Sequence, residues 1–109
     1  MAGQRPPQET DPGGERVSME VRDGVLVVRG EIDAASAASV ARTVRAPGPS
    51  ADGYRIDLTG VRYIDSRGIE ALFELAADGL EITVADGSLL QRVLHTVAMD
   101  QVAKVRTQS

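Results

Sequence analysis

The chain lacks cysteine, has a single histidine, His95, and carries only three aromatic side chains in 109 residues. Without cysteine, neither a disulfide nor a thiolate metal site can form. One histidine cannot supply a multi-histidine metal site. So few aromatic rings leave almost nothing on which nucleotide bases could stack. We therefore expect no metal ion and no cofactor.

Long apolar runs are also missing, since no stretch approaches the ~18 residues that a membrane span needs. Residues Met1–Gly14 are polar and rich in proline and glycine, without the apolar segment of a signal peptide. Acidic side chains outnumber basic ones by 16 to 12, which gives a net charge of −4 and argues against a basic nucleic-acid surface. We expect a cytoplasmic monomer that binds neither nucleic acid nor a membrane.

The length is enough for one domain. Residues 1–15 show no periodicity, and we expect them to form a disordered tail before a domain that spans 16–109. From Arg16 to Arg22 apolar and polar residues alternate, as in a half-buried strand. Asp23-Gly24 predicts a hairpin into a second strand, Val25–Ile32. The apolar run at the start of that strand predicts that it is covered on both faces.

Helical and strand patterns then alternate. Asp33 is a good N-cap for a first helix, because its carboxylate can accept a free backbone N–H. The patterns predict a third strand over 54–59, with residues 61–64 carrying the chain on to Asp65, and a fourth over 80–84. They also predict helices beginning after Asp33, at Ser66 and after Ser88, and a short last strand over 101–106. This order predicts an α/β fold: a mixed, mostly parallel sheet of four to five strands with an N-terminal β-hairpin and helices packed on it.

The junction of the third strand and the second helix, at Asp65-Ser66, is the most informative segment. Sites in α/β folds tend to lie at such carboxyl ends of strands. A phosphate on Ser66 would meet unsatisfied N–H groups and the positive end of the helix dipole. Gly68 has no side chain, so another protein could approach closely. From these residues alone, helix capping by Asp65 or Ser66 is the simpler explanation.

The same segment resembles the signature of the STAS domain of bacterial anti-sigma factor antagonists. In that family a strand ending in Asp-Leu-Ser-Gly-Val precedes Asp-Ser-Ser-Gly-Leu, and Gly-Glu-Leu-Asp precedes the first helix. The order of elements also matches over about residues 16–106. The similar segments here are Asp57-Leu58-Thr59-Gly60-Val61, Ile64-Asp65-Ser66-Arg67-Gly68-Ile69 and Gly30-Glu31-Ile32-Asp33.

The resemblance implies a phosphorylation switch. Ser66 matches the serine that a partner anti-sigma factor kinase phosphorylates. The unphosphorylated antagonist binds this anti-sigma factor and frees the sigma factor; phosphate breaks the complex, and a PP2C-type phosphatase restores it. The implied partner surface contains Asp33, Asp65, Ser66, Arg67, Gly68 and Ile69.

Three of these residues leave alternatives open. Arg67 stands where the family commonly has a second serine. It could pair with the phosphate, select a particular partner, or be a solvated arginine on an exposed turn. Asp65 could orient the Ser66 hydroxyl or cap the helix. Asp33 is expected to cap the first helix and to border the partner surface, and for both Asp33 and Asp65 we expect a mixed structural and recognition role.

Other functions fit the sequence less well. Ser66, His95 and an aspartate could be combined into a hydrolase triad, but the first glycine of the G-x-S-x-G motif is missing and His95 lies on a predicted helix. No P-loop and no G-x-G-x-x-G occurs, so we expect neither an enzyme nor a nucleotide-binding protein. STAS domains also serve as subunits of ABC-type lipid-transport machinery or of stress-signalling complexes, and this alternative stays open.

Overall fold

The computed structural model describes residues 17–46, 48 and 53–109. The predicted tail over residues 1–15, Arg16 and most of the predicted loop after the first helix lie outside these residues. The elements are β1 (Val17–Arg22), β2 (Val25–Ile32), α1 (Ala34–Arg45), β3 (Tyr54–Ile64), α2 (Ser66–Ala76), β4 (Leu80–Ala85), α3 (Leu89–Thr96), a 3-10 helix (Met99–Gln101) and β5 (Lys104–Gln108).

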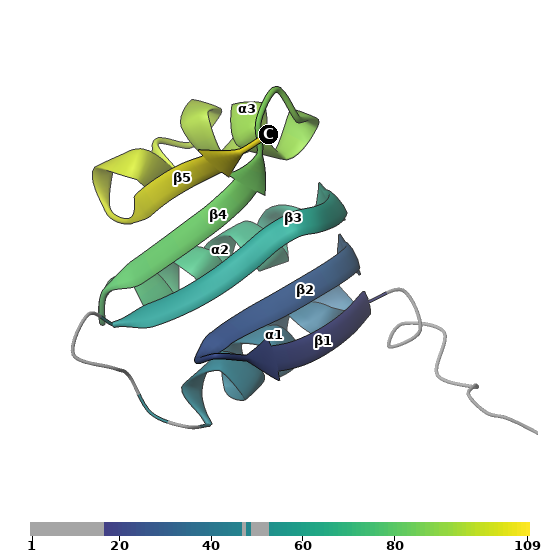
Figure 1. Ribbon diagram of the computed structural model, residues 1–109, viewed down its shortest axis with the longest axis vertical. Helices are drawn as coiled ribbons and strands as arrows, with labels where there is room; N and C mark the ends of the chain where they lie inside the picture. The colour runs from purple at the N-terminus through teal and green to yellow at the C-terminus, as the bar shows by residue number, and fades with distance from the viewer. Residues whose placement is uncertain (1–16, 47, 49–52) are drawn as a thin grey trace, which may run out of the picture.

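The five strands form one sheet in the order of the sequence, β1-β2-β3-β4-β5 (Figure 1). β1 and β2 are antiparallel, and the other neighbouring pairs are parallel. The predicted α/β fold with a mixed, mostly parallel sheet is therefore confirmed. The predicted hairpin is also confirmed. Asp23 and Gly24 both have positive φ, 55° and 79°, as a two-residue turn that follows the strand twist requires.

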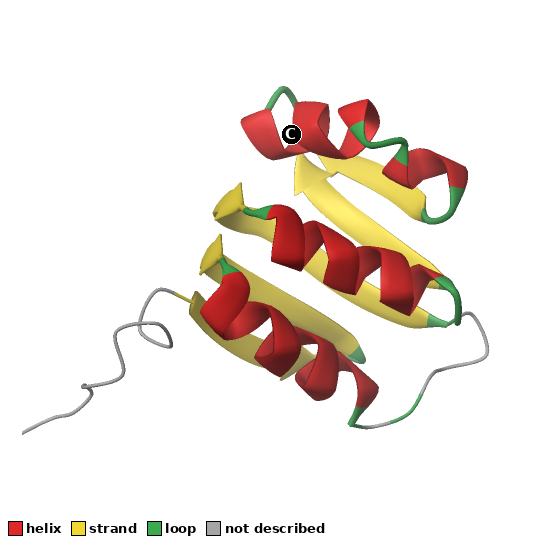
Figure 2. Cartoon of the chain, turned by 180° about the vertical axis from the view of Figure 1, so that it is seen from behind, coloured by secondary structure: helices red, strands yellow, loops and turns green. Residues whose placement is uncertain are grey.

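The three α-helices cover the same face of the sheet, with α2 between α1 and α3 (Figure 2). Alternate strand residues point to this face and meet the apolar sides of the helices, which is the period-two pattern read from the sequence. The buried side chains include Leu26, Val28, Ile56, Leu58, Ile82 and Val84 from the strands and Val40, Val44, Leu72, Leu75, Leu90 and Leu94 from the helices.

The prediction that β2 is covered on both faces is wrong. Leu26 and Val28 are buried beneath the helices, but Val25 and Val27 lie on the opposite face and are only half-buried. No element of the described chain covers that face. The apolar run does not require burial on both faces, because the branched side chain of valine favours a strand whether or not a second layer covers that strand.

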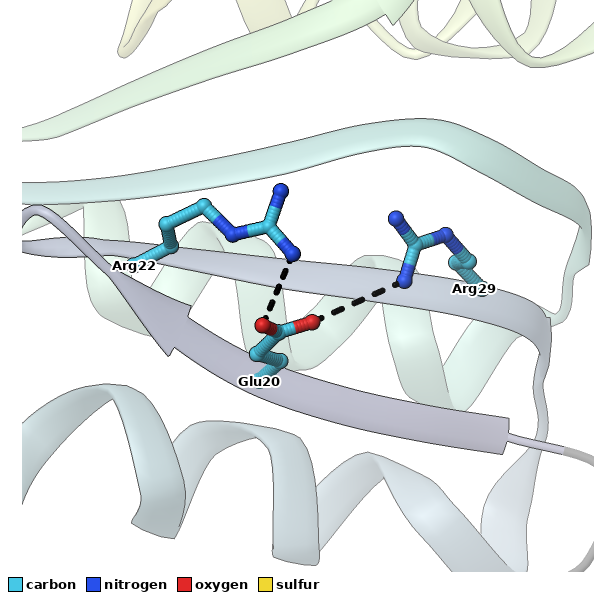
Figure 3. A network of polar contacts seen from close by, with 3 residues as sticks. All are labelled: Glu20, Arg22 and Arg29. Atoms are coloured by element: carbon cyan, nitrogen blue, oxygen red, sulfur yellow. Dashed lines mark hydrogen bonds and ion pairs between the residues drawn. The ribbon is translucent and has the colours of Figure 1, made fainter.

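Charged side chains stand on this open face. Glu20 on β1 accepts a hydrogen bond of 2.8 Å from Arg22 and lies 3.9 Å from Arg29 on β2 (Figure 3). The hydrogen bond and charge of Arg22 hold the pKa of the Glu20 carboxyl below its usual value. All three side chains are well exposed, so these ion pairs contribute little to stability.

The last strand exists but begins three residues later than the pattern suggested. Met99 is fully buried, and the chain turns through a 3-10 helix there instead of extending. Ala98 takes up this change of direction with a left-handed backbone, φ 61°. β5 then pairs with β4 from Lys104 onward. Val102, which was expected inside the strand, precedes it and is half exposed.

Candidate functional site

The carboxyl ends of β2 and β3 lie side by side at one edge of the sheet. Ile32 and Ile64 are partners in the ladder, and the amide of Asp65 donates a hydrogen bond of 3.0 Å to the carbonyl of Ile32. Asp33 and Asp65 each follow one of these strand ends and precede one of the helices α1 and α2. The N-termini of α1 and α2 therefore lie next to each other (Figure 2).

Asp33 caps α1. Its Oδ1 accepts hydrogen bonds from the amides of Ala35 (3.0 Å) and Ser36 (3.1 Å). In return the amide of Asp33 donates to the Ser36 hydroxyl at 3.0 Å, which completes a capping box. Ser36 is buried, so this arrangement fixes the chain as it leaves β2. The predicted capping role of Asp33 is confirmed.

Asp65 caps α2 in the same way. Its Oδ1 accepts from the amides of Arg67 (3.0 Å) and Gly68 (3.1 Å). Of the two alternatives for Asp65, the structure shows capping. The expectation that a phosphate on Ser66 would meet free amides of the first turn is wrong for these two, because a carboxylate already occupies them. A phosphate would instead add its charge beside that carboxylate.

Ser66 is the first residue of α2, and its side chain is exposed. Its hydroxyl makes no hydrogen bond to any described residue. Another molecule can therefore reach it without first opening a contact within this part of the chain. A serine needed for capping would have its oxygen on a backbone N–H, and here Asp65 performs that function.

Arg67 and Ile69, which follow Ser66 on α2, have different surroundings. Arg67 is exposed, forms no ion pair with any described residue, and lines a shallow depression between α1 and α2 together with Glu70 and Glu74. Ile69 is half-buried and packs against the core.

Gly68 is buried, and the expected close approach of a partner at this glycine is wrong. A Cβ on Gly68 would lie 2.5 Å from Cγ1 of Ile64 and 2.9 Å from Cγ2 of Ile32. The missing side chain makes room for the ends of β2 and β3, so this position faces inward. Its contribution to the site is to seat the first turn of α2 on the sheet.

Comparisons with known protein families and solved structures identify the family and the fold. The family model described as "Mlab, STAS domain" matches residues 15–106. The chain belongs to the STAS domain family. No curated protein matches it in sequence.

Two solved structures share the STAS fold of this chain. One is an anti-sigma factor antagonist from Mycobacterium paratuberculosis, with 24% identity over 90% of each chain and a TM-score of 0.64. The other is a proposed anti-sigma factor antagonist from Thermotoga maritima, with 16% identity, coverage of 84% of this chain and 86% of that one, and a TM-score of 0.60. At these identities the likeness establishes the fold.

The described part of the STAS domain holds no group of three or more histidine, cysteine, aspartate or glutamate side chains suited to a metal ion. No described helix has the length and apolar character needed to span a membrane. His95 is largely exposed on α3 and lies 3.9 Å from Asp100, outside the edge that carries Ser66.

One apolar surface of the STAS domain was not predicted from the sequence. Tyr63 at the end of β3 and Leu89 at the start of α3 are 50% and 59% exposed and line a common hollow. The pair Leu89-Leu90 could have indicated this surface. The helical pattern places only Leu90 in the core, so it predicts that Leu89 is exposed.

Proposed function

We propose that this STAS domain is an anti-sigma factor antagonist controlled by phosphorylation of Ser66. Its unphosphorylated form binds an anti-sigma factor serine kinase, so that the sigma factor is released. Phosphate on Ser66 ends that binding, and a PP2C-type phosphatase acting transiently restores it. The observation that carries the proposal is the exposed, unbonded hydroxyl of Ser66 at the start of α2. Two structures of the same fold are described as anti-sigma factor antagonists, which supports it.

The surroundings of Ser66 explain how a phosphate would act. Phosphorylation adds roughly −1.5 to −2 charges at pH 7. The new charge would stand beside Asp65, with Asp33 at the neighbouring helix start. Asp65 cannot turn away without giving up two hydrogen bonds to the backbone. A partner that has adapted to the neutral hydroxyl would face a concentrated negative charge, and like-charge contacts of this kind cost several kcal/mol at an interface.

The proposed partner surface is narrower than the motif suggested. Asp33 and Asp65 each use Oδ1 for capping, while Oδ2 accepts no hydrogen bond from any described residue and can meet a donor of the partner. Ser66 and Arg67 are exposed, and Ile69 is half-buried. Gly68 acts indirectly, by seating α2. The Ser66 hydroxyl makes no hydrogen bond to any described residue, and we assign the phosphate transfer and any ATP to the kinase.

The test is phosphosite mapping with the anti-sigma factor kinase of the same genome. The full chain, Ser66→Ala and Ser18→Ala are incubated with kinase and ATP. Ser18 is an exposed serine on β1 and serves as the matched control. The proposal predicts one phosphate on the wild type and on Ser18→Ala, and none on Ser66→Ala. Phosphate elsewhere, or none on the wild type with an active kinase, contradicts it.

The alternative role, as a STAS subunit of a lipid-transport or stress-signalling complex, gives a different result. The chain would then co-purify with an ABC-type ATPase or another stress-complex protein. Ser66→Asp would leave that complex unchanged. An association that is insensitive to Ser66→Asp therefore favours the alternative over the switch.

A further inference from the structure

A second surface lies on the α3 side of Ser66. β4 pairs with β3 only over Tyr54–Asp57, and beyond that point α3 packs beside the end of β3. Two adjoining hollows form there, which we call the α3 groove. The first, of about 90 Å³, is lined by Arg62, Tyr63, Ile64, Leu89, Leu90 and Val93. The second, of about 340 Å³, continues from Leu89 and Val93 along α3 past Arg92 to Val97.

The α3 groove is apolar and open. Leu89 is 59% exposed and Tyr63 is 50% exposed, while Val93 and Val97 are half-buried and pack against the core. Contiguous apolar patches mark interaction surfaces in soluble proteins, whereas single exposed apolar side chains need no explanation. Tyr63 and Leu89 line one hollow, so they form such a contiguous surface. Ligand pockets usually enclose ~300–1,000 Å³. The deeper hollow is too small for a metabolite, and the larger one is shallow, so side chains of another polypeptide fit better.

The charge at the rim restricts the occupant. Arg62 and Arg92 line the α3 groove, and no described acidic residue does. Arg62 lies 3.8 Å from Glu31 and is 76% exposed, and Arg92 forms no ion pair with any described residue. The whole chain nevertheless carries a net charge of −4. An apolar floor with two arginines at its rim, on an acidic protein, complements apolar side chains flanked by carboxylates.

We propose that the α3 groove binds an acidic amphipathic segment of the partner protein. Ile64 lines the α3 groove, and Asp65 and Ser66 follow it directly, so one partner can cover the switch and fill the α3 groove together. The identity of the partner rests on the proposed function, whereas the chemistry of the segment does not. An amphipathic helix that places leucines in the hollows would bring its acidic residues to Arg62 and Arg92.

The test uses two synthetic helical peptides with leucines at positions i, i+3, i+4 and i+7. The other positions are glutamate in one peptide and lysine in its match. Each is titrated into the ¹⁵N-labelled full chain. We expect the glutamate peptide to shift the amide signals of Tyr63, Leu89 and Val93, and to bind at least about tenfold more tightly than the lysine peptide. Equal binding of both peptides, no binding, or shifts confined to another face overturns the proposal.

Variants sharpen this test. Leu89→Ser removes an exposed side chain and should weaken the glutamate peptide about tenfold. Arg92→Glu should reverse the preference toward the lysine peptide. Val21→Ser, which removes an exposed apolar side chain on β1, should change neither affinity. If Leu89→Ser and Val21→Ser behave alike, the α3 groove is not the site.

One outcome would assign the α3 groove to a different occupant, and another would separate the groove from the switch. Self-association of the full chain in sedimentation, abolished by Leu89→Ser, would assign the α3 groove to a second copy and overturn the proposal. In the second outcome, the glutamate peptide binds as expected while Ser66→Asp still binds the kinase as tightly as the wild type does. That result would support the α3 groove as a binding site and contradict the switch at Ser66. The two hypotheses can therefore fail separately.

Discussion

The amide of Asp65 donates a hydrogen bond of 3.0 Å to the carbonyl of Ile32, which extends the pairing of β2 and β3 to the point where both helices begin. It places Asp33 and Asp65 at one edge of the sheet, each capping its own helix. Ser66 is the first residue beyond this junction and is the part of it left exposed. Its accessibility thus follows from the capping by Asp65.

Replacing Asp65 by alanine should destabilise the domain. Two amide hydrogen bonds at the start of α2 would be lost, and loss of such a cap costs about 1 kcal/mol, within a range of ~0.5–2. Asp65→Asn keeps an acceptor oxygen and should cost less. Urea unfolding of the two variants checks this. Equal stability of Asp65→Ala and the wild type would mean that the cap contributes nothing.

Replacing Gly68 by alanine should also destabilise the domain, although alanine favours a helix over glycine by ~1 kcal/mol. The new methyl group would lie 2.5 Å from Ile64 and must displace it, and overpacking of this kind costs ~1–3 kcal/mol. Ile64→Ala should reduce this cost in the double variant. If the Gly68→Ala domain were more stable than the wild type, the isoleucine side chains at the strand ends would be able to move aside at little cost in free energy.

Replacing Ser66 by aspartate should leave the free energy of unfolding within about 0.5 kcal/mol of the wild type. The negative charge gains from the dipole of α2 but stands beside the carboxylate of Asp65, and the two effects oppose each other. Thermal unfolding measures the balance, with Ser18→Asp on β1 as the control. A large loss of stability would mean that the switch acts by unfolding the domain rather than through the interface.

The ion pair on the open face predicts a titration shift. Glu20 should titrate below an ordinary glutamate, because Arg22 donates a hydrogen bond to its charged form and attracts it. Since the pKa in the folded state is lowered, the associated stability is present above the unfolded pKa, near 4.5, and is lost as the pH falls through the folded value. Side-chain NMR of the wild type and Arg22→Ala should show the midpoint rising in the variant.

Local patterns predicted most of the fold because the relevant signals are local. Asp23 and Gly24 form a turn through their own positive φ angles. Asp33 and Asp65 cap their helices by accepting hydrogen bonds from amides two and three residues further on. At the last strand the prediction failed because a contact distant in the sequence decided the outcome. Burial of Met99 moved the start of β5 to Lys104.

The site was predicted in the same partial way. The motif located Ser66, but the inward packing of Gly68 depends on Ile32, which is far from it in the sequence. The α3 groove brings Tyr63 together with Leu89, and nothing in either local pattern indicates that meeting. Residues whose role depends on pairing across elements are those that the sequence did not reveal.

The switch itself is tested most directly by calorimetric titration of the anti-sigma factor kinase with the full chain, unphosphorylated and phosphorylated on Ser66, without added ATP. We predict that the unphosphorylated chain binds and that phosphate weakens binding at least about tenfold, which corresponds to ~1.4 kcal/mol. Equal affinity of the two forms would contradict the proposal that Ser66 is the switch.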